Sequence, residues 1–135
     1  GMNIVNDWPP NKEQILARFP VEGVCVYLTY GDTIYNPTGG EIPEDFIVHE
    51  QVHIEQQKAY GGPEKWWNSY ISDWLFRIQQ EAPAYGAQIA FIRRKNGRAV
   101  AEKRLNEFVK YLKSPIYDCP LHALEIRRML FRESL

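Results

Sequence analysis

The chain has 135 residues, of which 44% are hydrophobic and 13% aromatic, so it can bury one hydrophobic core and we expect a single domain over residues 1–135. Its 16 basic and 17 acidic residues give a net charge of −1, which argues against nucleic acid or an anionic membrane surface as a partner. No apolar run is long enough to span a membrane and no signal-peptide pattern opens the chain, so we expect a cytoplasmic protein with Cys25 and Cys119 as free thiols.

The N-terminal part of the chain predicts a short helix followed by a β-hairpin. Residues 12–18 have a helical spacing of apolar positions. Residues 23–30 are rich in β-branched and aromatic side chains, which is typical of a strand. Gly31 and Asp32 then favour a turn, and residues 33–36 are the expected partner strand.

A longer helix is predicted to begin at Pro43. Proline fits the first turn of a helix, and the acidic side chains of Glu44 and Asp45 favour the positive end of the helix dipole. We expect this helix to run from about residue 44 to residue 60 and to end at the two glycines that follow.

The rest of the chain predicts helices separated by prolines and one glycine. Pro63 and Pro83 each favour a helix start, and apolar residues recur at three- and four-residue spacing after both. We expect these helices over about residues 63–78, 83–95, 99–113 and 121–132. The predicted fold class is therefore α+β, mostly helical, with a small N-terminal hairpin.

The predicted helix over residues 44–60 contains the pattern His-Glu-x-x-His at residues 49–53. His49 and His53 are four residues apart, so they project from one face of the helix and can bind a single metal ion. Glu50 lies about 100° around the helix, where it can reach a metal-bound water without being a ligand. A catalytic zinc ion takes three protein ligands, so a third must come from elsewhere in the chain.

The candidates for the third ligand are His122, Cys119 and a carboxylate, of which Glu81 is favoured. Glu81 lies in an apolar stripe, where an unpaired carboxylate would cost several kcal/mol unless a cation compensates its charge. Pro83 predicts that Glu81 lies at a junction between two helices, where its side chain can turn inward. The alternative is a glutamate that interacts with a helix dipole or pairs with an arginine.

The order of these residues resembles the zincin metallopeptidases, and among them the gluzincins, in which a glutamate of a later helix follows the His-Glu-x-x-His motif. Here that glutamate lies 28 residues after His53, and residues 81–85 are similar to the corresponding run in small zincin-like proteins of bacteria and phages. The resemblance implies a zincin-like fold, with the strand over residues 23–30 beside the cleft and Glu50 as the general base. It also implies that Zn²⁺ is bound by His49, His53 and Glu81.

The chain departs from the larger gluzincins in two respects. They usually carry an aspartate four residues after the ligand glutamate, whereas Tyr85 stands here, where its hydroxyl can hydrogen-bond a histidine or the carboxylate. The group that would stabilise the transition state is not identified by any motif. Tyr117 and His122 are the candidates, although the favoured interpretation of His122 is a surface residue.

The predicted function is zinc-dependent hydrolysis of peptide bonds in a peptide or protein substrate, which would lie extended beside an edge strand of the hairpin. One alternative is a catalytically inactive zincin-like scaffold that binds a metal or a protein partner. A second alternative is a helical interaction domain in which the motif is accidental.

Overall fold

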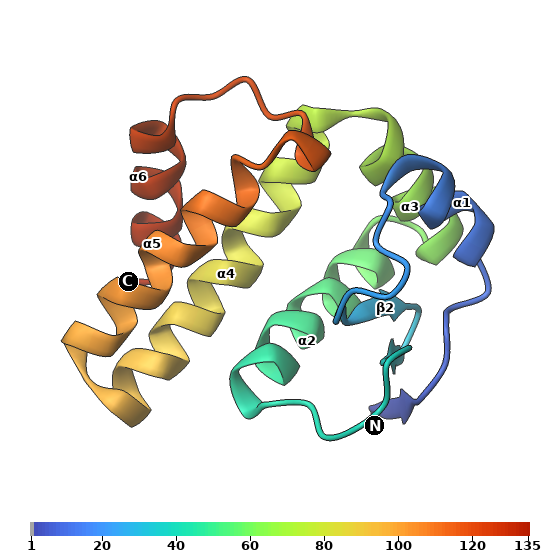
Figure 1. Cartoon of the computed structure of the whole chain (residues 1–135), viewed down its shortest axis with the longest axis horizontal. Helices are drawn as coiled ribbons and strands as arrows, with labels where there is room; N and C mark the ends of the chain where they lie inside the picture. The colour runs from blue at the N-terminus through green and yellow to red at the C-terminus, as the bar shows by residue number, and fades with distance from the viewer. Residues whose placement is uncertain (1) are drawn as a thin grey trace.

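The computed structural model describes residues 2–135, and Gly1 lies outside it. Within these residues the chain forms a mostly helical α+β fold with a small sheet, as the sequence predicts, and the sheet has three strands (Figure 1). The strands are β1 (Asn3–Val5), β2 (Leu28–Tyr30) and β3 (Thr33–Tyr35). The helices are α1 (Lys12–Arg18), α2 (Glu44–Ala59), α3 (Pro63–Ser72), α4 (Trp74–Asn96), α5 (Arg98–Leu112) and α6 (Ala123–Glu133), with a short 3-10 helix, η1 (Pro115–Tyr117), before α6.

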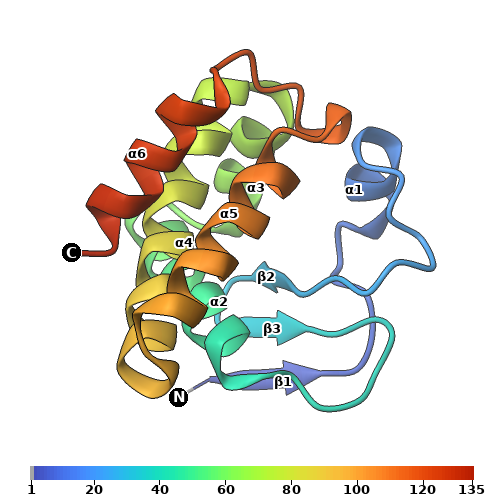
Figure 2. The same ribbon diagram turned by 60° about the vertical axis from the view of Figure 1, so that its left-hand side comes forward.

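The sheet has the strand order β1-β3-β2, so β2 is an edge strand (Figure 2). β2 and β3 form the predicted antiparallel hairpin, with Thr29 opposite Ile34. β1 was not predicted, and it pairs with β3 in parallel. The strand predicted over residues 23–30 is shorter than expected because β3 ends at Tyr35 and leaves residues 23–27 without a partner strand.

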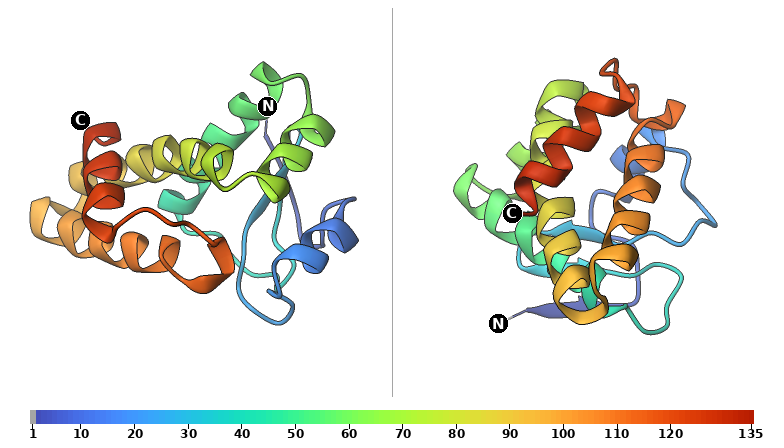
Figure 3. Two further views of the ribbon diagram at one scale, coloured as in Figure 1. Left: turned by 90° about the horizontal axis from the view of Figure 1, so that it is seen from above. Right: turned by 90° about the vertical axis from the view of Figure 1, so that its left-hand side faces the viewer.

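The helix α4 lies at the centre of the fold. α2 and α3 pack against one side of it and α5 and α6 against the other (Figures 1 and 3). None of the helices formed by residues 2–135 combines the length and the apolar character that a membrane crossing requires.

The boundary between α3 and α4 lies at Asp73, which corrects the prediction of a boundary at Pro83. The Asp73 carboxylate accepts hydrogen bonds from the backbone N–H groups of Leu75 and Phe76, at 3.0 and 3.3 Å, and so caps the start of α4. α4 then continues through Pro83, whose missing N–H leaves the carbonyl of Gln79 without a helical partner. Gln79 is exposed, so water can satisfy that carbonyl.

Two groups of buried side chains form the core. The first joins α4, α5 and α6 and consists of Ile78, Ala82, Tyr85, Ile89, Ile92, Ala101, Leu105, Phe108, Val109, Leu112, Ile126 and Leu130. The second joins α1 and α3 and consists of Ile15, Phe19, Val21, Trp66, Trp67 and Tyr70. A cavity of about 440 Å³ has walls from both groups.

Gly86 allows α4 and the end of α6 to approach each other closely. A Cβ atom at this position would lie 2.6 Å from the backbone carbonyl carbon of Glu133, so one helix would have to move. We expect Gly86→Ala to lower the free energy of unfolding by about 1–3 kcal/mol, although the same change in an open helix is normally stabilising. Urea denaturation measures this, and Arg94→Ala, an exposed change on the same helix, is the control. An unfolding free energy equal to that of the wild type would show that α6 can move away from position 86 without a loss of stability.

Candidate metal centre

The two motif histidines lie on the buried face of α2. The helix begins at Glu44, as predicted, and carries His49 and His53 one turn apart. Each histidine is 5% exposed, and their Nε2 atoms lie 3.1 Å from each other. Both imidazoles therefore point at the same small volume between α2 and α4.

Glu81 of α4 faces the two histidines. Its Oε1 atom lies 3.2 Å from Nε2 of His49 and 2.8 Å from Nε2 of His53. Its Oε2 atom accepts a hydrogen bond of 2.9 Å from the hydroxyl of Tyr70. Burial raises the pKa of Glu81, but the two histidines lower it by more. The pKa of this carboxyl therefore lies well below its usual value, and the carboxyl is ionised. Glu81 lies within α4 rather than at the predicted helix junction.

The other nitrogen of each histidine is held by a glutamine side chain. Nδ1 of His49 lies 2.9 Å from Oε1 of Gln88, and Nδ1 of His53 lies 2.8 Å from Oε1 of Gln56. An amide oxygen can only accept a hydrogen bond, so each Nδ1 carries a proton. In the neutral imidazoles each Nε2 therefore presents a lone pair toward Glu81.

Three lone-pair atoms that face each other at 2.8–3.2 Å need a cation between them. A proton can take this place: burial lowers the pKa of His53, but the Glu81 carboxylate outweighs it and raises that pKa to about 9. A metal ion also fits, because ligand atoms around a tetrahedral zinc ion with bonds of about 2.1 Å lie about 3.4 Å apart. Oε1 of Glu81 is buried and has no hydrogen-bond donor of its own, as expected of an atom that faces a cation.

Glu50 lies at the edge of the same cluster. Its carboxylate and the ring nitrogens of His49 and His53 lie within 4.8 Å of one another, so these three residues can also hold a metal ion. Its Oε2 atom is 3.7 Å from Nε2 of His49, farther than the Glu81 oxygen. Its Oε1 atom accepts a hydrogen bond of 2.9 Å from Thr29 of β2. Burial raises the pKa of the Glu50 carboxyl, which favours its use as a base near neutral pH.

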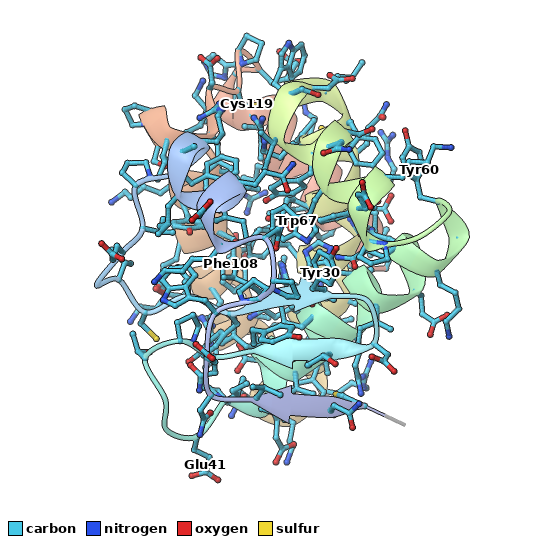
Figure 4. The ribbon with its side chains drawn as sticks, turned by 90° about the vertical axis from the view of Figure 1, so that its right-hand side faces the viewer. Tyr30, Glu41, Tyr60, Trp67, Phe108 and Cys119 are labelled. Atoms are coloured by element: carbon cyan, nitrogen blue, oxygen red, sulfur yellow. The ribbon has the colours of Figure 1, made fainter. Side chains whose placement is uncertain are left out.

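The cluster forms one wall of the 440 Å³ cavity. Half of the other residues that line the cavity are aromatic, and Trp67 and Phe108 lie in the interior between the sheet and the helices (Figure 4). Outside the cluster, the charged residues that line the cavity are Arg104 and Glu107 of α5. The size and the lining are typical of a site for a small molecule or a short peptide segment.

Not all of the predicted residues reach the cluster. His122 is an exposed residue at the start of α6, where its Nδ1 accepts a hydrogen bond from the N–H of Leu124. Cys119 is free and packs against the core group of α4, α5 and α6, and Figure 4 shows it above Trp67 of the cavity wall. Neither residue lines the cavity, so neither is available as the third ligand.

Tyr85 and Tyr117 both line the cavity. Tyr85 contacts His49 through its ring, with the ring centres 4.4 Å apart, whereas its hydroxyl forms no hydrogen bond with a histidine or with Glu81. Tyr117 belongs to η1, and its ring packs against Tyr111 of α5. Burial raises the pKa of Tyr117 well above its usual value, so its hydroxyl keeps its proton and can donate a hydrogen bond.

The residues that hold the cluster in place were missed from the sequence. Tyr70, Gln88 and Gln56 contact the ligand candidates, and Thr29 contacts Glu50. The only signal for them was their expected position in a helix or strand. For Tyr70 this position indicated that the side chain is buried, but it did not indicate which residue the hydroxyl contacts. A polar residue in a buried helical stripe, such as Gln88, could have been singled out by the reasoning used for Glu81.

Comparison of the chain with protein-family models, with curated proteins and with solved structures finds no match. The geometry and chemistry of the cluster are therefore the basis for inferring a function.

Proposed function

We propose that the protein is a zinc-dependent peptidase of the gluzincin type, with a zincin-like fold. The observation that carries the proposal is the arrangement around Glu81: two histidines with fixed tautomers and one ionised carboxylate surround a single point, and a second carboxylate lies beside them. A zinc ion bound there by His49, His53 and Glu81 would acidify water and polarise a carbonyl group.

Glu50 is the general base of this proposal. Its carboxylate is buried at the edge of the ligand set, and Thr29 orients it with a hydrogen bond to one oxygen. The other oxygen is directed toward the cluster and would take the proton from the attacking water. The same oxygen would then deliver the proton to the leaving amine.

The substrate peptide would lie beside the segment that leads into β2. Residues 25–27 line the cavity and have no strand partner within residues 2–135, so their backbone can pair with an extended peptide. The carbonyl of Thr29 accepts hydrogen bonds from Gln57 and Trp67, which fix β2 against α2 and α3. The peptide would therefore be held on a rigid edge at the level of Glu50.

Tyr117 is the proposed donor to the oxyanion. It lines the cavity, and its hydroxyl keeps its proton at neutral pH. Among the two candidates that the sequence offered, it is the one that the fold brings to the cavity. A hydroxyl placed there would strengthen its hydrogen bond as the carbonyl oxygen gains charge.

The test is hydrolysis of a broad panel of peptides by protein reconstituted with zinc, set against the same protein treated with a chelator. We expect cleavage that disappears on chelation and returns when zinc is added back. Stoichiometric zinc without any cleavage would favour the inactive scaffold. Failure to bind zinc after reconstitution would contradict every metal-dependent function.

Zinc affinity is expected to rise with pH up to about pH 9. Zinc binds Nε2 of His53 only when that atom is unprotonated, and the pKa of His53 is raised from 6.5 to about 9. Below that pKa the apparent affinity should fall about tenfold for each pH unit. Competition with a zinc-buffering chelator between pH 6 and pH 9.5 measures this. An affinity that stops rising near pH 7 would show that Glu81 does not hold a proton on His53.

A further inference from the structure

Three side chains, those of Arg104, Asp45 and Gln88, connect α5 with the candidate ligand His49. Nη2 of Arg104 lies 2.9 Å from Oδ2 of Asp45, and Nε2 of Gln88 donates a hydrogen bond of 2.8 Å to the same oxygen. Oε1 of Gln88 in turn lies 2.9 Å from Nδ1 of His49. Gln88 is 0% exposed, so both ends of its amide need these partners.

The donors and acceptors along the hydrogen bonds from Arg104 to His49 fit in one direction only. The Arg104 guanidinium can only donate, and the Asp45 carboxylate, paired with it, can only accept. The amide nitrogen of Gln88 must therefore face Asp45, and its oxygen must face His49. A flipped amide would place an oxygen against the carboxylate and would leave Nδ1 of His49 facing a donor.

The direction of these hydrogen bonds decides which nitrogen of His49 can bind a metal. With the amide oxygen at Nδ1, the proton stays on Nδ1 and Nε2 presents its lone pair to Glu81 and His53. In the opposite tautomer, a proton on Nε2 would point into the cluster. His53 needs no such series of side-chain hydrogen bonds. Its partner Gln56 is held directly, because Nε2 of Gln56 donates a hydrogen bond of 2.9 Å to the backbone carbonyl of Gln80.

We propose that Arg104, Asp45 and Gln88 are positioning residues that fix the tautomer and orientation of His49 for metal binding. The inference rests on the metal site proposed above. It assigns a role to Asp45 that differs from stabilising the start of α2, and it makes metal affinity depend on a residue of α5. Arg104 also contacts Phe46 and Phe108, with its guanidinium carbon 5.8 and 5.1 Å from their ring centres. These contacts fix the end of the hydrogen-bond series that is farthest from His49.

The test is Asp45→Asn, which keeps the size of the side chain but offers Gln88 a donor as well as an acceptor. The neighbouring change Glu44→Gln is the matched control, because Glu44 also links α2 to α4, through Lys95 at 3.7 Å, without any contact to His49. Zinc affinity is measured by chelator competition. We expect Asp45→Asn to bind zinc about 10–100-fold more weakly than wild type and Glu44→Gln to bind it equally well.

A second measurement separates positioning from a general loss of structure. In the zinc-loaded wild type, the Nδ1 proton of His49 should give a slowly exchanging imidazole signal in the NMR spectrum, and in Asp45→Asn this proton should exchange faster. If Asp45→Asn does not fold, Arg104→Gln replaces it, with Arg104→Lys expected to restore wild-type affinity.

The outcomes distinguish this inference from the proposed function. Wild-type zinc affinity and wild-type proton exchange in Asp45→Asn would overturn the positioning role and leave the metal site intact. A wild-type protein that binds no zinc would overturn both. Zinc binding with the expected loss in Asp45→Asn, but without peptide cleavage, would support the positioning role and contradict the peptidase.

Discussion

A Glu50→Gln variant is expected to keep zinc bound and to hydrolyse peptides about 10²–10⁴-fold more slowly than the wild type. The amide has the size of the carboxylate and can still accept the hydrogen bond of Thr29, which is 2.9 Å long in the wild type. It cannot take a proton from water, because an amide is not a base at neutral pH. The measurement is kcat/KM on the best substrate of the panel, with zinc content determined on the same sample.

Glu55→Gln is the matched control for this experiment. Glu55 is an exposed carboxylate on the same helix as Glu50 and does not line the cavity, so its removal should leave the rate unchanged. Wild-type turnover by zinc-loaded Glu50→Gln would exclude Glu50 as the base. Loss of zinc from that variant would instead show that Glu50 is a ligand, as its position within the His49 and His53 group allows.

A Glu81→Gln variant is expected to bind zinc about 10²–10³-fold more weakly. A four-ligand zinc site contributes about 10–16 kcal/mol, so one ligand supplies roughly 2.5–4 kcal/mol, and a neutral amide oxygen replaces little of it. In the wild type, Oε1 of Glu81 is the atom that faces both histidines, at 3.2 and 2.8 Å. Chelator competition at a fixed pH measures the affinity.

Tyr70→Phe is the control for the Glu81 variant. It removes the hydrogen bond to Oε2 of Glu81 but keeps the carboxylate, so we expect a loss of about tenfold, the lower end of the range for residues that orient a ligand. Undiminished affinity in Glu81→Gln would remove Glu81 from the ligand set. His49, Glu50 and His53 would then remain as the group that holds the ion.

The helix that carries the motif could be predicted because its signals are local. Pro43, the acidic pair that follows it and the glycines after residue 60 are all contained in one stretch of sequence, and the structure confirms a helix over Glu44–Ala59. The spacing of His49 and His53 then fixed their common face. The meeting of Glu81 with the two histidines was expected from a buried carboxylate in an apolar stripe, and the structure brings the three together.

The contacts between distant segments could not be predicted. Asp45 reaches Gln88 across 43 residues and Arg104 across 59, and no pattern in one sequence indicates which helices will lie next to each other. Asp45 was instead assigned to the dipole of its own helix, a role that any acidic residue in a first turn suggests. The boundary at Asp73 was missed because Pro83 gave the more familiar signal of a helix break.

Because α4 is continuous through Pro83, the positions of Glu81 and Gln88 relative to each other are set by the geometry of a single helix. Glu81 and Gln88 are seven residues apart, which in a continuous helix places them on the same face, two turns and about 10.5 Å apart along the axis. Adding or removing one residue between them would rotate Gln88 by about 100° away from His49 while leaving Glu81 in place. Related chains that keep this site should therefore vary in sequence between these positions but not in length.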